Sequence, residues 1–89
     1  MERVVINCSG ITTKEAFHTA LAQALQFPAW YGGNLDALHD LLTAITASTA
    51  LQLQGWVELE TALSPYGKRL EKVLAISALE NPNLTIEFC

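Results

Sequence analysis

Basic side chains are scarce in this sequence of 89 residues, which holds five Lys and Arg against nine Asp and Glu and has a net charge of −4. None of the five lies between Lys14 and Lys68, an interval that contains the acids Glu15, Asp36, Asp40, Glu58 and Glu60. An acidic surface repels a phosphate backbone, so direct binding of nucleic acid is not expected. Such acidity serves either solubility or the attraction of a basic protein, and charge alone does not choose between them.

Long apolar runs are also missing, although 51% of the residues are apolar. No segment approaches the roughly 20 apolar residues that span a membrane. The first residues lack the apolar stretch of a signal peptide, so we expect a cytoplasmic protein without membrane contact. The apolar fraction favours a folded chain over disorder, and the length predicts a single domain over residues 1–89.

Cysteine is limited to Cys8 and Cys89, near opposite ends of the chain. In a reducing cytosol free thiols are favoured, but the sequence does not exclude a disulfide bond between the two cysteines. No Cys-x-x-Cys pair is present and the two histidines, His18 and His39, lie apart, so we expect no metal site. Because P-loop and dinucleotide-binding fingerprints are absent as well, no cofactor is expected.

Three short segments have the residue pattern of β-strands. Residues 3–7 have the pattern of a buried strand, and residues 50–54 and 84–88 alternate between apolar and polar side chains. Helical segments fill the intervals in the order β-α-α-β-α-α-β, and crossovers of this length favour parallel strands. The sequence therefore predicts an α/β fold, with a small three-stranded parallel sheet packed with about four helices, in a monomer.

Several helix ends carry their own signals. Thr12 followed by Glu15 is typical of a capping box and predicts a helix to about Leu25. The apolar face of this helix leaves His18 on the other side, where we expect it to be solvated. A short helix is preferred for residues 55–63, with Trp56 in the core. Ser64-Pro65 then predicts the start of a last helix, which runs to about residue 80 and is broken by residues 81–83.

Residues 27–34 link the first two helices through an unusual loop. The residue before Pro28 is disfavoured in the helical region, which ends the first helix. Trp30 and Tyr31 are adjacent aromatics in the loop, of which Tyr31 taken alone is expected to be structural. The two glycines that follow, residues 32 and 33, can take positive φ without a Cβ penalty. Asn34 is expected to cap the next helix, which ends near residues 45–47.

The second helix divides into two faces on a helical wheel. Its apolar face consists of Leu35, Leu38, Leu41, Leu42 and Ile45. The opposite face carries Asp36, His39, Asp40 and Thr43. Asp36 and Asp40 are four residues apart, where like charges repel by a few tenths of a kcal/mol. Selection for helix stability alone would more readily place a basic residue at position 40.

The polar face allows several interpretations. It is either a solvated surface or a functional site. A small enzyme would use Cys8, at the carboxyl end of the first strand, or His39. Paired carboxylates also occur in glycosidases. The Gly-Gly-Asn turn could hold a phosphate, although Asp36 would oppose it. Tryptophan and tyrosine are favoured anchors of protein interfaces, so Trp30 and its neighbours favour a protein-binding edge.

The central motif resembles a known family. Pro28-x-Trp30-Tyr31-Gly32-x-Asn34-Leu35-Asp36-Ala37-Leu38-x-Asp40 is similar to barstar, the intracellular inhibitor of barnase-type ribonucleases, and the similarity runs over the full chain. The resemblance implies a small parallel sheet with helices and a non-catalytic protein. It also implies that the loop and acidic helix insert into the active site of a basic secreted ribonuclease. The alternative is a binding module, without inhibitory activity, for another basic protein.

The resemblance also implies roles for single residues. Asp40 matches an acid that enters the phosphate site of the ribonuclease, and Asp36 matches a second acid that faces basic residues. Trp30 matches an aromatic that packs on the catalytic histidine of the enzyme. The predicted partner-binding set is Trp30, Tyr31, Gly32, Asn34, Leu35, Asp36, His39, Asp40 and Thr43.

The sequence departs from barstar at four positions that bear on this site. His39 and Ile45 replace tryptophans, Ala44 replaces glycine, and Ile76 replaces an acid. These changes indicate a different ribonuclease or another basic protein as partner. We also expect a pH effect, because protonating His39 would offset the charge of the nearby acids and weaken binding of a basic partner below about pH 6.

Overall fold

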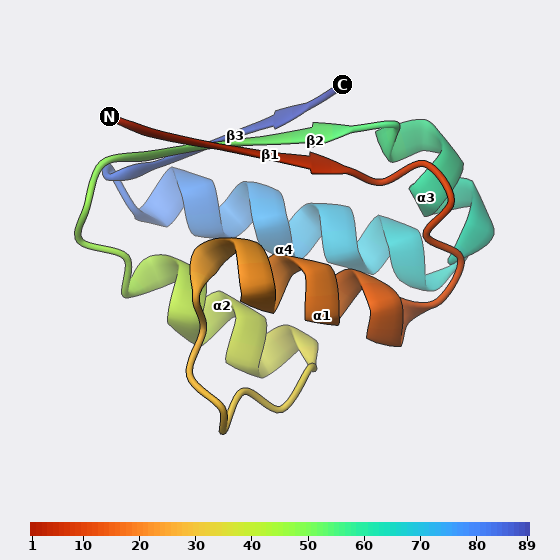
Figure 1. Cartoon of the computed structure of the whole chain (residues 1–89), viewed down its shortest axis with the longest axis horizontal. Helices are drawn as coiled ribbons and strands as arrows, with labels where there is room; N and C mark the ends of the chain where they lie inside the picture. Colours follow the sequence, from red (N-terminus) through yellow and green to blue (C-terminus); the bar gives the residue numbers. More distant parts are fainter.

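A computed structural model describes residues 1–89 and shows a three-stranded parallel sheet with helices on one face (Figure 1). The strands are β1 (Glu2–Asn7), β2 (Thr49–Gln54) and β3 (Leu84–Phe88), in the order β1-β2-β3. Both pairs are parallel, with Val4 beside Leu51 and Leu51 beside Ile86. The predicted fold class, strand direction and order of elements are confirmed.

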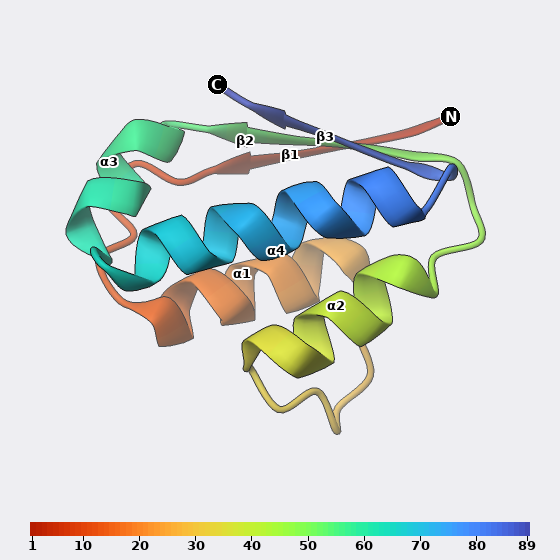
Figure 2. The same ribbon diagram turned by 180° about the vertical axis from the view of Figure 1, so that it is seen from behind.

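Four helices connect the strands, as predicted: α1 (Lys14–Leu25), α2 (Leu35–Thr43), α3 (Trp56–Ala62) and α4 (Tyr66–Glu80). α1 and α4 lie against the sheet, and α2 lies beside α4 farther from it (Figures 1 and 2). Both crossovers step in the same direction across the sheet, so right-handed connections place all the helices on one face. None of these helices combines the length and the apolar character needed to cross a bilayer.

The sheet therefore has one covered face and one open face. In β1 the side chain of Ile6 is buried, whereas that of Val5 is 49% exposed. Successive residues of a strand point to opposite faces, so only alternate positions of β1 can reach the core. The expectation that residues 3–7 form a buried strand is wrong for Val5, because no helix covers its face of the sheet.

The core lies between the sheet and the helices. It holds fourteen buried apolar residues: Ile6, Cys8, Phe17, Leu21, Leu38, Leu42, Leu51, Leu53, Trp56, Leu59, Leu63, Leu70, Leu74 and Leu84. The predicted core position of Trp56 is confirmed. Its indole Nε1 donates to Glu60 at 3.1 Å and to Glu71 at 2.8 Å, which joins α3 to α4.

Three helix ends differ from their sequence signals. Thr13, not Thr12, caps α1, because its Oγ1 accepts from the Ala16 amide at 3.1 Å. Threonine is a favoured N-cap residue at either position, although only Thr12 is followed by a glutamate three residues later. Pro65, not Ser64, is the N-cap residue of α4, and no side-chain hydrogen bond is made there. α2 ends at Thr43, earlier than predicted.

Gly67 is buried in the first turn of α4, where α3 passes close by. A Cβ at this position would lie 2.5 Å from the carbonyl oxygen of Glu60 and 2.8 Å from its Cα. We expect Gly67→Ala to lower the free energy of unfolding by about 1–3 kcal/mol, because the overpacked backbones must separate. Urea denaturation measures this loss.

The control is the reverse change on the exposed side of the same helix, Ala75→Gly. There the intrinsic preference of alanine for helices makes glycine the worse residue, by about 1 kcal/mol. A Gly67→Ala variant more stable than the parent protein would show that the contact between α3 and α4 can relax without cost.

Candidate functional site

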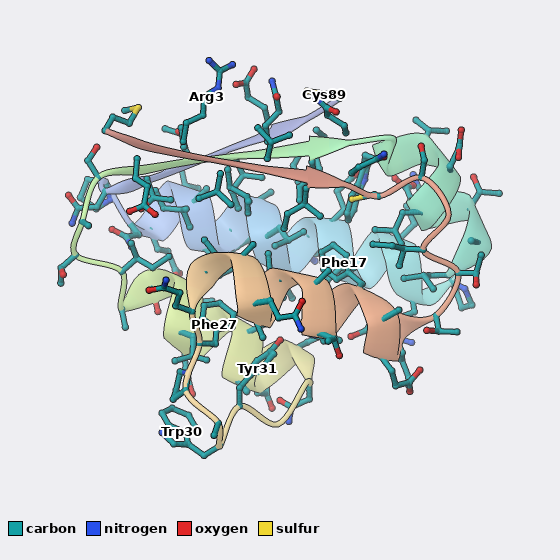
Figure 3. The ribbon with its side chains drawn as sticks, viewed as in Figure 1. Arg3, Phe17, Phe27, Trp30, Tyr31 and Cys89 are labelled. Carbon is teal, nitrogen blue, oxygen red and sulfur yellow. The ribbon has the colours of Figure 1, made fainter.

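The loop between α1 and α2 projects away from the sheet and carries Trp30 at its outer end (Figure 3). It begins at Gln26, which has left-handed backbone angles (φ 57°, ψ 46°) and ends α1. The Tyr31 amide donates to the Pro28 carbonyl at 3.0 Å, and the rings of Phe27 and Tyr31 meet edge to face at 5.0 Å. These contacts order the loop while the side chain of Trp30 stays 72% exposed.

The turn into α2 depends on Gly32, Gly33 and Asn34. Asn34 is the N-cap, as predicted, and its Oδ1 accepts from the Ala37 amide at 2.8 Å. Gly33 uses the positive φ that glycine allows, at 66°, whereas Gly32 does not. At Gly32 a larger residue would be crowded, because a Cβ there would lie 3.0 Å from the Asn34 Nδ2. One left-handed residue is enough to turn the chain into the helix.

The outward face of α2 presents two carboxylates to solvent. Asp36 and Asp40 are both exposed, and the side chain of Asp40 is 83% accessible. Leu38 and Leu42 are buried on the opposite side of the helix, and Leu35 is half-buried. The helix therefore separates its two faces as the sequence pattern predicted.

No Lys or Arg forms an ion pair with these carboxylates. Lys68 pairs instead with Glu60 of α3, with their atoms 2.6 Å apart. Lys14 and Arg69 lie over the ring of Tyr66, at 5.3 and 5.7 Å from its centre. The negative charge of α2 is therefore left without a cationic side chain of this protein to offset it.

His39 connects the acidic face of α2 to the end of α4. Its Nε2 lies 2.6 Å from the Glu80 carboxylate, and its Nδ1 lies 4.0 Å from that of Asp40. Glu80 is separated from His39 by 41 positions, so no local pattern could place it in the site. Together, the carboxylates of Asp36, Asp40 and Glu80 form what we call the acidic edge. Glu80 is the third of them, and sequence reasoning missed it.

Two members of the predicted set use their polar groups within the protein. The Thr43 hydroxyl donates to the His39 carbonyl of its own helix at 2.7 Å. The Tyr31 hydroxyl is hydrogen-bonded to Nδ1 of His18, which agrees with the structural role expected of that tyrosine. Both residues shape the edge rather than offer free polar groups at it.

The expectation that His18 is solvated is wrong. Its side chain is 3% exposed, and its Nε2 is hydrogen-bonded to the Tyr66 hydroxyl at 2.7 Å. The periodicity of α1 placed His18 off the apolar face of that helix. However, the loop and α4 cover it there, through residues that are distant in sequence. Burial lowers the pKa of His18 below its ordinary value of 6.5.

Cys8 is not placed to act as a nucleophile. Its side chain is fully buried, and burial raises the pKa of its thiol to about 11. The thiolate is the reactive form of cysteine, and that form is suppressed here. Cys8 is buried and Cys89 exposed, and both thiols are free, as the reducing-compartment argument favoured.

Comparison with known proteins agrees with this arrangement. The model of the family described as "Barstar (barnase inhibitor)" matches residues 1–87. The chain is also 36% identical over 63 residues to a protein of Bacillus subtilis (strain 168) named "Putative ribonuclease inhibitor YrdF". That alignment covers 71% of this chain and 57% of the relative, so the chain spans little more than half of the curated protein it matches. By its match over nearly its whole length, the chain belongs to the barstar (barnase inhibitor) family.

Proposed function

We propose that this protein is a non-catalytic inhibitor of a basic, barnase-like ribonuclease, acting as a monomer in the cytoplasm. One observation carries the proposal: Asp36 and Asp40 stand exposed on α2, with no Lys or Arg of this protein paired to them. The exposed Trp30, in the loop before α2, adds an aromatic anchor. Carboxylates placed this way attract a cationic cleft and speed the encounter with it.

The proposed mechanism is mimicry of the substrate by side chains. The Asp40 carboxylate would occupy the place of a substrate phosphate and accept hydrogen bonds from arginines of the enzyme, in a geometry that can be bidentate. Asp36 would face a second basic group, and Trp30 would pack on the enzyme's catalytic histidine. Gly32, Asn34 and Leu35 would set the path of the backbone at the contact.

The proposal is tested by titration calorimetry against a panel of barnase-like ribonucleases, with RNA cleavage measured in parallel. We expect one-to-one binding that blocks cleavage. If a carboxylate replaces phosphate, a mononucleotide bound to the enzyme must raise the apparent dissociation constant of the inhibitor. Tight binding that leaves cleavage intact would instead favour a binding module, and absence of binding across the panel would refute the inhibitor role.

Binding should also depend on pH through His39. Protonation places a positive charge 2.6 Å from Glu80 and 4.0 Å from Asp40, which reduces the negative potential of the edge. A loss of about 1 kcal/mol, or about fivefold in affinity, is the expected scale for one exposed charge at such distances. We therefore expect the wild-type protein to bind its partner more weakly at pH 5.5 than at pH 8.

His39→Gln separates this effect from titration of the partner. The glutamine keeps a hydrogen-bonding side chain but cannot take up a proton. The ratio of wild-type to variant affinity, measured across the pH range, isolates the contribution of His39. A ratio that stays constant between pH 5.5 and 8 would show that His39 does not influence binding.

A further inference from the structure

A buried histidine joins three separate parts of the fold. His18 comes from α1, Tyr31 from the loop before α2, and Tyr66 from the first residue of α4. The ring of His18 lies 5.7 Å from that of Tyr31 and 6.2 Å from that of Tyr66, and each of its nitrogens is hydrogen-bonded to one phenol. With 3% of its side chain exposed, His18 is an inner link between these segments rather than part of the acidic edge.

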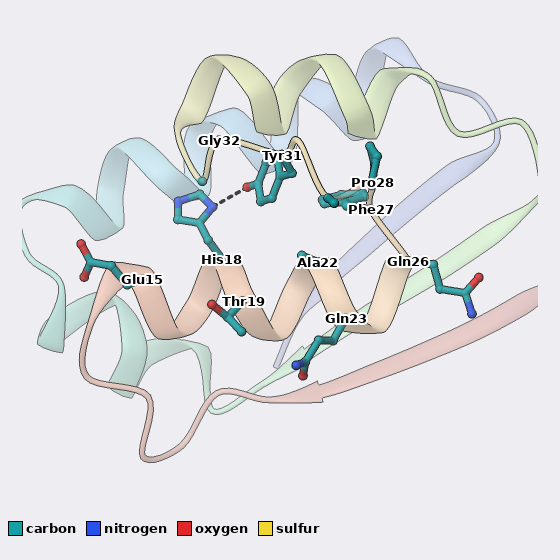
Figure 4. A pocket seen from close by; sticks show the side chains of 12 residues that line it. Glu15, His18, Thr19, Ala22, Gln23, Gln26, Phe27, Pro28, Tyr31 and Gly32 are labelled. Atoms are coloured by element: carbon teal, nitrogen blue, oxygen red, sulfur yellow. Dashed lines mark hydrogen bonds between the residues drawn. The ribbon is translucent and has the colours of Figure 1, made fainter.

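The link crosses a cleft that separates the loop from α1. The cleft has a volume of about 670 Å³, and both His18 and Tyr31 line it (Figure 4). The figure shows their hydrogen bond reaching from the helix to the loop. Gly33 also lies against His18, because a Cβ at Gly33 would be 3.8 Å from that of the histidine. Among the side-chain hydrogen bonds, this is the one that ties the loop to α1.

With a neutral imidazole, the hydrogen bonds between the ring and the two phenols also use the proton of one phenol. A neutral ring has one N–H donor and one bare nitrogen, so one tyrosine donates to it and the other accepts from it. A protonated ring donates from both nitrogens, so the phenol that donated must turn its proton away, and that O–H then has no acceptor in the protein. Neither hydroxyl bonds to any other protein group. Burial raises the pKa of Tyr31 to about 12, so the phenols stay protonated at physiological pH.

The charges around His18 do little to stabilise an imidazolium. Glu15, on the same helix, favours the charged form, and Lys14 opposes it. Arg69, whose guanidinium lies 5.7 Å from the ring centre of Tyr66, adds a second cation on the α4 side. Loss of water on burial outweighs the carboxylate, and the pKa of His18 is lowered.

We propose that His18 is a pH-sensitive latch, which holds residues 27–33 in place while neutral and releases them when it takes up a proton. The latch is a property of the free protein. Its consequence, weaker partner binding in acid, rests on the proposed function. The latch differs from the His39 effect because His18 acts through the position of the loop, whereas His39 lies in the acidic edge itself.

The direction of the pH dependence follows from proton linkage. Because the pKa of His18 is lowered in the folded protein, the unfolded chain takes up its proton first as the pH falls. The contribution of His18 to stability is complete above about pH 6.5 and declines as the pH falls toward the lowered pKa. The loop should loosen over the same range, before the sheet does.

The test is hydrogen exchange of the Phe27 and Tyr31 amides in the free protein, corrected for the intrinsic pH dependence of exchange, because these are the amides of residues 27–34 that donate backbone hydrogen bonds. We expect Tyr31→Phe to speed exchange of these two amides about tenfold at pH 7.5, the factor that corresponds to one lost hydrogen bond, with the strands unaffected. Tyr66→Phe should speed it in the same direction. Thr19→Ala, an exposed change next to His18 that removes none of these bonds, is the matched control.

The pH arm compares the wild-type protein with His18→Gln between pH 7.5 and 5. Wild-type exchange of the loop should rise in acid relative to the strands, and the variant should show no such rise. Nitrogen NMR of the wild-type imidazole should show one protonated and one bare nitrogen at neutral pH. If His18→Gln does not fold, the two tyrosine variants and the NMR measurement still test the latch.

Loop exchange that is unchanged in Tyr31→Phe, or a His18 ring that is already doubly protonated at pH 7, would overturn the latch and leave the inhibitor role untouched. Conversely, a working latch in a protein that binds no ribonuclease would refute the proposed function alone. If both hold, Tyr31→Phe should weaken ribonuclease binding about tenfold, and Thr19→Ala should not change it.

Discussion

Replacing Asp40 by alanine is expected to weaken ribonuclease binding at least about 30-fold while leaving the fold intact. Truncating one partner of a buried, hydrogen-bonded charge pair at an interface costs about 2–5 kcal/mol or more, because the opposite charge stays buried without its partner. In the free protein the Asp40 side chain is 83% accessible and pairs with no Lys or Arg, so its loss should scarcely change the stability of the monomer. Calorimetry for binding and urea denaturation for stability measure the two effects.

Two further variants define the cause. Asp40→Asn keeps the shape and removes the charge, so it should lose most of the same affinity. Glu58→Ala removes another exposed acid, from α3, and it controls for net charge alone. If Asp40→Ala and Glu58→Ala weakened binding equally, the acidic edge of α2 would not be the contact surface.

Replacing Asn81 by alanine is expected to lower the free energy of unfolding by about 2–4 kcal/mol, because buried carbonyl groups lose their donors. The Asn81 side chain is 4% exposed, and its Nδ2 donates to the carbonyls of Leu42 at 2.9 Å and Ile45 at 3.0 Å. Its Oδ1 accepts from the Asn83 amide at 2.9 Å. One side chain therefore anchors the end of α2 to the turn between α4 and β3.

For a domain of this size, that loss corresponds to a Tm lower by about 10–25 °C in thermal unfolding. Asn83→Ala is the matched control, since it removes the same side chain two residues later at an exposed position. Surface changes of that kind usually alter stability by less than about 0.5 kcal/mol. Equal losses in the two variants would mean that the bonds of Asn81 to α2 contribute nothing.

Local sequence signals predicted a structural feature well where residues of one segment determine it. The Asn34 cap, the two faces of α2 and the loop position of Trp30 follow from neighbouring residues and the helical period. The same reasoning misplaced the cap of α1 by one residue. Thr12 and Thr13 are both suited to an N-cap, so the residue type alone does not choose between them.

The parts of the site that pair residues far apart in the chain were beyond such reasoning. Glu80 joins the acidic edge through His39, and Tyr66 encloses His18 together with Tyr31. A wheel drawn for one helix shows which residues avoid that helix's own core face. It does not show what another segment places over them, and the expectation of a solvated His18 failed for that reason.

The α/β class, the order of the elements, the scarcity of positive charge and the polar face with Asp36 and Asp40 could all be predicted from the amino-acid sequence. Each of these depends on composition or on a period of two or 3.6 residues along one segment. The three-dimensional fold was needed to show that one face of the sheet is open, that Glu80 extends the acidic edge and that His18 is buried. Those features depend on which crossover and which helix come to lie against a given surface, and such contacts join residues that no local period relates.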